Sequence, residues 1–156
     1  MIRTVDTRYP ELDLDRQHCF RLYAAARAVV RAYGPLLGPV GLTYPQYLAM
    51  LALWESPEGT MTVGALGERL RLDTGTLTPL LKRLESAGHV SRRRDPADER
   101  RVLLAVTDEG WALRDRVTHV PSEILRSIDL APGEVADLRR LLDLVVEQLE
   151  QDSPTP

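Results

Sequence analysis

The chain has 156 residues, of which 44% are apolar and 28% charged, so it can bury the core of one domain and still supply dimerisation arms. No apolar run is long enough to cross a bilayer, no secretory signal is recognisable, and the single cysteine excludes an intramolecular disulfide framework, which together predict a cytoplasmic protein with no membrane partner. The net charge of −3 argues weakly against nucleic acid as a partner.

The first predicted element is a long helix that follows an N-terminal arm of about a dozen residues. Asp13 and Asp15 favour a helix start, and either Gly34-Pro35 or Gly38-Pro39 would end the helix at about Leu37. Apolar residues along it step by three and four, which is a heptad pattern suited to a partner helix. We name this set the N-terminal seam: Cys19, Leu22, Ala26, Val29, Tyr33 and Leu36.

A second helix is predicted from Thr43 to about Trp54, with Pro45 in its first turn. Its inward residues are expected to be Leu48, Leu51 and Ala52. The residues expected to end it are Ser56, Pro57 and Gly59.

The next two helices have the spacing of a helix-turn-helix. Thr62 is a good N-cap for the first, and the apolar residues that follow, Val63, Leu66 and Leu70, share one face. Asp73 caps the second, and Gly88 supplies its left-handed end. Its inward stripe is expected to be Leu77, Leu80, Leu81 and Leu84.

The outward side of this second helix carries hydroxyls near its N-terminus and two cations further along. Such a helix suits the major groove, since hydroxyls reach base edges while charges meet phosphates. We name this set the reading face: Thr74, Thr76, Thr78, Lys82 and Arg83. Pro79 removes the backbone hydrogen bond to Gly75, a defect that the nearby helix start should soften.

A two-stranded ribbon is predicted to follow, because Val90–Arg94 and Arg101–Val106 alternate with period two around the turn Asp95–Glu99. We name this hairpin the wing. Its cations can enter a minor groove, whose negative potential attracts arginine. They are Arg92, Arg93, Arg94, Arg100 and Arg101. The alternative to DNA binding is a hairpin whose charges only face solvent. A helix-turn-helix directly before the hairpin makes this alternative less favoured.

The distribution of charge reverses the inference from the net charge. From Thr62 to Thr107 there are 9 Lys and Arg against 6 Asp and Glu, so this region is locally +3 although the chain is −3. The affinity for phosphate depends on the local patch more than on overall charge. The acidic balance therefore does not exclude DNA.

The C-terminal part predicts two more helices. Thr107 caps the first, which runs through Trp111, Leu113 and Val117 and is interrupted at Pro121. Beyond Pro132 a second heptad pattern appears, which we name the C-terminal seam: Val135, Leu138, Leu142, Val145 and Leu149. Gln151–Pro156 is expected to be a frayed tail.

The two seams predict a two-fold homodimer, since one small winged helix cannot bury both. The expected fold is mainly α with a small β wing, a winged helix-turn-helix in one chain. Residues 13–40 and 108–150 are assigned to dimerisation, and residues 42–107 to a DNA-binding region.

Several segments carry a resemblance to a known family. At the wing, Asp98 and Arg100 followed by Leu104–Thr107 match a D-x-R signature that ends in a helix cap. The other matching segments are Cys19-Phe20, Arg31–Leu37, Leu42–Glu55 and Leu72–Glu85. The sequence thereby resembles the MarR family of dimeric winged-helix regulators, most closely its organic hydroperoxide resistance (OhrR) branch of the one-cysteine type. The resemblance covers roughly Asp13 to Glu150. It also implies that Asp98 is one of the DNA-binding residues.

The resemblance implies a peroxide-reactive cysteine, Cys19, held by tyrosines that map onto Tyr33 and Tyr44, with Tyr23 nearby. A position in the first turns of a helix favours a thiolate, although Asp13 and Asp15 oppose it. Cys19 and Tyr33 are about 21 Å apart along one helix, so they can meet only across a dimer. The alternative is a buried apolar cysteine that serves only packing.

The chain lacks the second cysteine with which some members of this branch form an intersubunit disulfide. Oxidised Cys19 can become a sulfenic acid, a mixed disulfide with a small cellular thiol, a sulfenamide, or an over-oxidised acid, and these alternatives stay open. His18, His89 and His119 are too scattered for a metal site, and no phosphate-binding glycine loop or nucleophile elbow is present. No cofactor, metal or catalytic residue is expected.

The sequence thus predicts a repressor that binds a pseudo-palindromic double-stranded operator and releases it when organic hydroperoxide oxidises Cys19. Two alternatives remain. One is a regulator released by a small phenolic ligand, with Cys19 as a packing residue. The other is an enzyme, a thiol peroxidase that uses Cys19.

Overall fold

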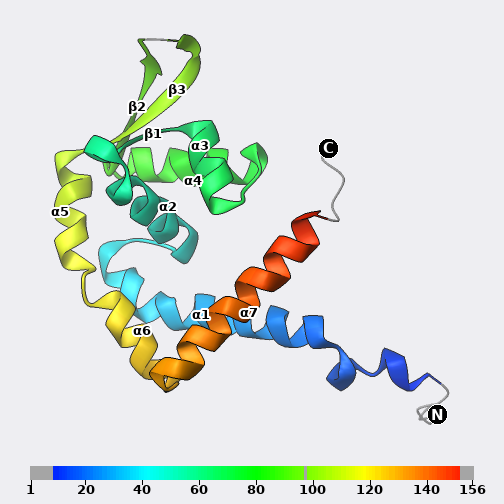
Figure 1. The fold of residues 1–156 in the computed structure, drawn as a ribbon. Coiled ribbons are helices and arrows are strands. Elements are labelled where there is room, and N and C mark those ends of the chain that lie inside the picture. The colour runs from blue at the N-terminus through cyan, green and yellow to red at the C-terminus, as the bar shows by residue number, and fades with distance from the viewer. Residues whose placement is uncertain (1–8, 97, 152–156) are drawn as a thin grey trace, which may run out of the picture. The chain divides into compact units, whose positions relative to one another are not determined.

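The computed structural model describes residues 9–96 and 98–151, apart from the side chain of Glu99. They form two compact units, one ending at Val120 and the other beginning at Pro121 (Figure 1). Most of the predicted N-terminal arm lies outside the described residues, as does the predicted tail beyond Gln151.

The long first helix, α1, spans His18–Leu37, so the prediction that it starts at Asp13 is wrong. Two 3-10 turns precede it, η1 (Pro10–Leu12) and η2 (Leu14–Arg16). The Gln17 side-chain amide donates back to the carbonyl oxygens of Glu11 and Asp13, at 2.6 and 3.3 Å. Those carbonyl groups therefore turn toward Gln17, and Asp13 itself is extended.

Of the two predicted ends of α1, the second is the real one. Gly34 and Pro35 lie inside the helix, and Gly38 is its C-cap. The 3-10 turn η3 (Gly38–Val40) follows, and the chain then turns through Gly41, whose φ of 73° lies in the left-handed region.

Helix α2 spans Tyr44–Glu55, within one residue of the prediction. Thr43 and Gln46 form a capping box at its start. The predicted inward face is only partly right, because Ala52 is buried whereas Leu48 and Leu51 are half-buried. The helix is apolar on nearly every side, so periodicity does not select a face, and Tyr47, Met50 and Leu53 are also buried.

The helix-turn-helix consists of α3 (Val63–Leu70) and α4 (Thr74–Ser86), as predicted. The Thr62 hydroxyl accepts from Ala65 N, and a carboxylate oxygen of Asp73 accepts from Thr76 N, so both predicted N-caps are confirmed. Gly88, at φ 77°, ends α4 with two bonds: its amide donates to Glu85 O, and the next amide donates to Leu84 O. All four leucines of the predicted inward stripe are buried.

The wing is longer than predicted, with β2 at Val90–Asp95 and β3 at Asp98–Val106. Asp95 pairs with Asp98 beyond an irregularity after Arg94, which shortens the predicted five-residue turn. A further strand, β1 (Thr60–Thr62), was not predicted; it pairs antiparallel with β3, so the sheet order is β1-β3-β2. It follows the 3-10 turn η4 (Pro57–Gly59).

Three helices follow the wing: α5 (Asp108–Arg116), α6 (Val120–Ile128) and α7 (Pro132–Gln151). Thr107 caps α5, as predicted, by accepting from Gly110 N. The prediction that Pro121 interrupts this helix is wrong, because α5 has already ended at Val117 and Pro121 lies in the first turn of α6. Proline suits that position, where its missing N–H costs nothing.

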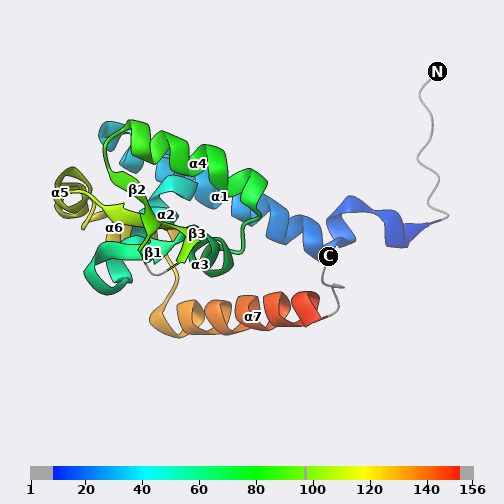
Figure 2. The same cartoon turned by 90° about the horizontal axis from the view of Figure 1, so that it is seen from above.

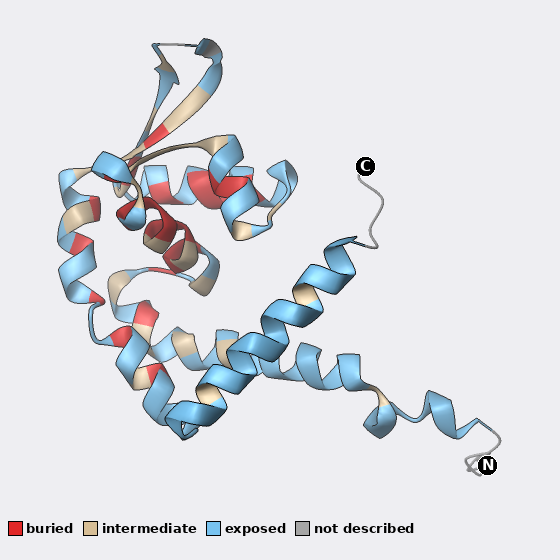
Figure 3. Cartoon of the chain, in the orientation of Figure 1, coloured by how far each residue is buried: buried red, intermediate tan, exposed pale blue. Residues whose placement is uncertain are grey.

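The fold class is confirmed: a mainly helical winged helix-turn-helix with a small antiparallel sheet. In the first unit, α2, α3 and α4 cluster at the base of the wing in both views (Figures 1 and 2). Their buried side chains form one core with residues of β2, β3 and α5 (Figure 3). Within the described residues no single helix is long and apolar enough to span a membrane, and only the pair His18–Val40 and Tyr44–Glu55, bent by 72°, meets that test together.

Candidate nucleic-acid interface and redox site

The five residues of the reading face are all exposed on α4. Two of their hydroxyls are also used within the helix: Thr76 Oγ1 donates to Asp73 Oδ2 at 3.0 Å, and Thr78 Oγ1 donates to Thr74 O at 2.8 Å. The backbone hydrogen bond from Thr76 lowers the pKa of Asp73, with a further contribution from the Thr76 hydroxyl. A hydroxyl that donates inward keeps its lone pairs for an incoming donor, so this surface can accept hydrogen bonds.

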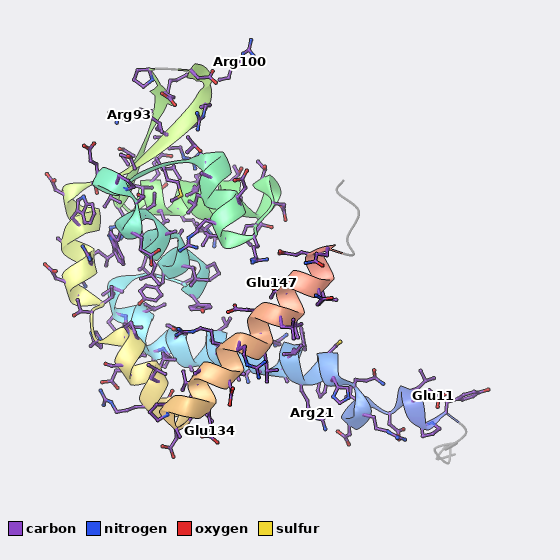
Figure 4. All side chains as sticks on the ribbon, viewed as in Figure 1. Glu11, Arg21, Arg93, Arg100, Glu134 and Glu147 are labelled. Atoms are coloured by element: carbon purple, nitrogen blue, oxygen red, sulfur yellow. The ribbon has the colours of Figure 1, made fainter. Side chains whose placement is uncertain are left out.

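The register of the wing assigns its arginines to two faces. Arg92 pairs with Leu104, whose side chain is fully buried, so Arg92 lies on the inner face. Arg93 is opposite Leu103 and lies on the outer face. Figure 4 shows Arg93 and Arg100 projecting to different sides of the hairpin.

Two acidic residues, Glu85 and Asp98, contact wing arginines. Arg92 Nε lies 3.3 Å from Glu85 Oε2, which ties the inner face of the wing to α4. Asp98 Oδ1 accepts from the backbone N of Arg100 at 3.1 Å, so its carboxylate shapes the tip of the wing. The exposed wing arginines are Arg93, Arg94, Arg100 and Arg101.

Cys19 is exposed and is the second residue of α1. The first turn of α1 contains no acidic residue, because Asp13 and Asp15 belong to the segment before the helix. Cys19 therefore lies at the end of α1 where the unpaired backbone amides and the positive end of the helix dipole are found.

Tyr33 and Tyr44 lie together where α1 meets α2, with ring centroids 4.2 Å apart. A third tyrosine that the sequence reasoning missed, Tyr47, packs against Tyr33 with the ring centroids 5.8 Å apart and the rings tilted by 40°. The i, i+3 spacing of Tyr44 and Tyr47 was the available signal. We call these three residues the tyrosine cluster.

Burial controls the ionisation of the tyrosine cluster. Burial raises the pKa of Tyr33 to about 12, with further contributions from Tyr44 and Tyr47. Burial likewise raises the pKa of Tyr44 and of Tyr47. The three phenols therefore stay protonated at neutral pH and can act as hydrogen-bond donors.

The structure does not bring the predicted redox residues together within one chain. Tyr33 is fourteen residues beyond Cys19 on the same helix, a separation of about 21 Å. Tyr23 joins neither group: it is 57% exposed, and its hydroxyl accepts from Arg27 Nη1 at 2.9 Å. A site that contains both Cys19 and the tyrosine cluster requires a second chain.

Comparisons with known proteins identify the family of this chain. A model described as MarR family matches residues 42–102. The organic hydroperoxide resistance transcriptional regulator of Bacillus subtilis is 40% identical over 147 residues, which is 94% of this chain and 99% of that protein. The chain belongs to the MarR family.

Two other similar proteins are regulators as well. The HTH-type transcriptional regulator TtmR of Methylorubrum extorquens is 53% identical over 129 residues, which is 83% of this chain but 63% of that protein. Reduced AbfR of Staphylococcus epidermidis, solved bound to DNA, is 34% identical, with a TM-score of 0.73 over 91% of this chain and 98% of that one. Overoxidised AbfR has also been solved bound to DNA.

In this MarR-family chain, a hydrogen-bonded junction that sequence reasoning missed links α2, α5 and the base of the wing. Trp54 Nε1 donates to Gly110 O at 3.1 Å, although the two residues are 56 positions apart. Gly110 also packs directly against His89 O, which leaves no room for a side chain at position 110. The Thr107 hydroxyl donates to Gly88 O at 2.5 Å. These contacts connect the helix that carries Tyr44 and Tyr47 to the end of α4.

Among the described residues of this MarR-family chain, no group of three His, Cys, Asp or Glu side chains is placed to hold a metal ion. His89, one of the three scattered histidines, is partly buried. Burial lowers its pKa, and Arg116 lowers it further, whereas Glu109 acts in the opposite direction.

Proposed function

We propose that this protein is a dimeric, cytoplasmic, DNA-binding repressor that senses organic hydroperoxide through Cys19 and releases its operator once Cys19 is oxidised. The observation that carries the proposal is the position of the only cysteine. Cys19 is exposed at the N-terminus of α1. The cluster of protonated tyrosines begins fourteen residues further along the same helix, about 21 Å away, so the tyrosines of the same chain cannot reach Cys19. The name of the Bacillus subtilis relative supports hydroperoxide as the signal.

The first step needs only the thiolate and the hydroperoxide. The sulfur attacks the terminal peroxide oxygen, the one that carries the hydrogen, so an S–O bond forms and the O–O bond breaks, and the leaving alkoxide takes a proton to become an alcohol. Cys19 is oxidised by two electrons to a sulfenic acid while the hydroperoxide is reduced. A small cellular thiol then condenses with the sulfenic acid, giving a mixed disulfide and water.

The tyrosine cluster supplies hydrogen-bond donors for this step. In a two-fold dimer, Tyr33 and Tyr44 of one subunit are proposed to donate to the Cys19 thiolate of the other. Donation of a hydrogen bond to the charged form stabilises the thiolate. A bulky mixed disulfide at Cys19 removes these bonds and pushes on α2, whose Trp54 reaches the base of the wing through Gly110.

The reading surface fits double-stranded DNA. The reading face is proposed to enter the major groove while the wing arginines meet the backbone and the minor groove. A two-fold dimer presents two such surfaces, so the operator is proposed to be pseudo-palindromic, with half-sites about one helical turn apart.

The test is fluorescence anisotropy of the protein on a labelled duplex from the region upstream of its neighbouring genes, found by footprinting. Reduced wild type and Cys19→Ser are expected to bind about equally, and organic hydroperoxide with a small thiol is expected to release only the wild type. Release of Cys19→Ser at the same peroxide concentration would contradict the thiol mechanism and favour the phenolic-ligand alternative. Repeated turnover of hydroperoxide with a thiol reductant would instead favour the peroxidase alternative.

A further inference from the structure

A histidine that the proposed mechanism does not use lies at the corner between α4 and the wing. His89 comes after the end of α4 and directly before β2. Its carbonyl oxygen accepts from Thr107 N at 3.2 Å, and Gly110 of α5 packs directly against the same carbonyl group. We propose that His89 is a pH-sensitive switch: α5 stays packed on this corner while the imidazole is neutral, and protonation loosens α5 and weakens operator binding without any change at Cys19.

The surroundings of the imidazole favour its neutral form. The side chain is partly buried, and Nδ1 is buried without a hydrogen-bond partner among the described residues. A neutral imidazole carries a single N–H and can leave Nδ1 unprotonated, whereas an imidazolium carries an N–H on both nitrogens. Protonation would therefore bury a donor that has no acceptor, and an unsatisfied buried group costs more when it is charged.

The charged groups that act on this imidazole come from α5, the helix packed against the corner. Burial lowers the pKa of His89 most, Arg116 lowers it further, and Glu109 acts in the opposite direction. On α4 and β2, Glu85 and Arg92 face each other at 3.3 Å. Because the folded protein binds this proton less readily than the unfolded chain, the stabilising contribution of His89 is present above about pH 6.5 and is lost as the pH falls below that value.

Loosening this corner would affect both surfaces that are proposed to meet DNA, so the inference rests on the proposed function. The wing strands meet here, because Val90, directly after His89, pairs with Val106, directly before Thr107. The Thr107 hydroxyl also donates to Gly88 O, at the end of the helix that carries the reading face. Release of α5 therefore allows the wing to change its angle relative to α4, and two surfaces that no longer fit the same duplex bind it less tightly.

The first test measures the operator affinity of the reduced, full-length protein between about pH 7.5 and about pH 5.5 at constant ionic strength. Wild type is expected to lose about threefold or more in affinity over this range. His89→Leu, which fills the site but cannot bind a proton, should show no such loss; His89→Phe takes its place if circular dichroism shows that the leucine variant is unfolded. His119→Gln is the matched control, because His119 is exposed, and it should lose affinity as wild type does.

Two variants on α5 should act in opposite directions while His89 itself is retained. Arg116→Gln removes the repulsive charge, so it should raise the pKa of His89 measured by NMR titration and reduce the loss of affinity. Glu109→Gln removes the attractive charge, so it should lower that pKa and increase the loss. A purely structural role for His89 would not produce opposite changes in the two variants.

A second test needs no DNA. The Trp54 indole donates to Gly110 O at 3.1 Å, so the resonance of its N–H reports whether α5 is packed on α2. In wild type, acid is expected to lower the protection of this N–H from solvent exchange, compared at each pH with a free indole. In His89→Leu the protection should remain.

The outcomes separate the switch from the redox proposal. An unchanged wild-type affinity in acid, or an equal loss in His89→Leu, would show that the switch is wrong. Cys19→Ser should still respond to acid, because the proton acts at His89 and not at sulfur. If peroxide fails to release the operator while acid still weakens binding through His89, the peroxide-sensing proposal fails and the switch stands.

Discussion

Helices α4 and α7 carry the same kind of apolar stripe but differ completely in burial. On α4, Leu81 and Leu84 are 0% exposed, whereas on α7, Leu142 and Leu149 are 40% and 64% exposed (Figure 3). Amphipathic spacing therefore predicts a helix and its apolar face, but not what covers that face. Helix α4 finds its cover within the chain, and we propose that the C-terminal seam on α7 finds its cover in a second subunit.

The comparison predicts that a charge in the C-terminal seam abolishes both assembly and DNA binding. Leu142→Asp would place a carboxylate in apolar packing at a cost of several kcal/mol. Operator binding should fail with it, since two half-sites need two linked subunits. The control is Ala136→Asp, which adds the same charge off the seam. Sedimentation and anisotropy measure the two effects, and a Leu142→Asp dimer that binds normally would show that the seam packs elsewhere.

Truncating one leucine on each helix separates the two kinds of burial. Leu81→Ala should lower the free energy of unfolding by about 2–5 kcal/mol without changing the dimer dissociation constant. Leu138→Ala should instead weaken the dimer while the winged-helix unit remains folded at low concentration. Denaturant titration and sedimentation distinguish the two outcomes. If Leu81→Ala and Leu138→Ala changed the dimer dissociation constant equally, the proposed difference between α4 and α7 would be wrong.

A smaller effect on operator binding is expected when an exposed arginine of the wing is replaced. Arg100→Gln should lower operator affinity and flatten the slope of log K against log salt by about one unit for each phosphate that the side chain no longer neutralises. Measuring this slope for wild type and variant decides whether the wing meets DNA. An unchanged slope would place the wing away from it.

Local signals allowed most of the winged-helix unit to be predicted from sequence. The caps at Thr62, Asp73 and Thr107 and the left-handed end at Gly88 each depend on a few neighbouring residues, and all four are confirmed. The start of α1 was not predictable in this way, because the Gln17 side chain competes for backbone carbonyl groups.

Features that depend on residues distant in sequence were missed. Strand β1 has three residues and is defined only by its pairing with β3. The hydrogen bond from Trp54 to Gly110 joins residues that are 56 positions apart, so no local sequence pattern predicts it. For the redox site, the family resemblance identified Cys19, Tyr33 and Tyr44, but only the structure shows that Tyr47 packs with the two tyrosines. The roles of all these site residues remain predictions.

We propose that the redox site is assembled from Cys19 of one subunit and Tyr33 and Tyr44 of the other. Mixed dimers test it directly. In the first, one subunit carries Cys19→Ser and the other carries Tyr33→Phe with Tyr44→Phe. In the second, all three substitutions are on one subunit and the other is wild type.

Each mixed dimer retains one Cys19, and the measurement is the rate at which organic hydroperoxide consumes that thiol. In the first mixed dimer the remaining Cys19 faces intact tyrosines across the interface, so its rate should match the wild-type rate per thiol. In the second it faces two phenylalanines, so oxidation should be slower, because the thiolate loses its donors. A slow first dimer and a fast second one would place the tyrosines beside the cysteine of their own subunit and contradict the account.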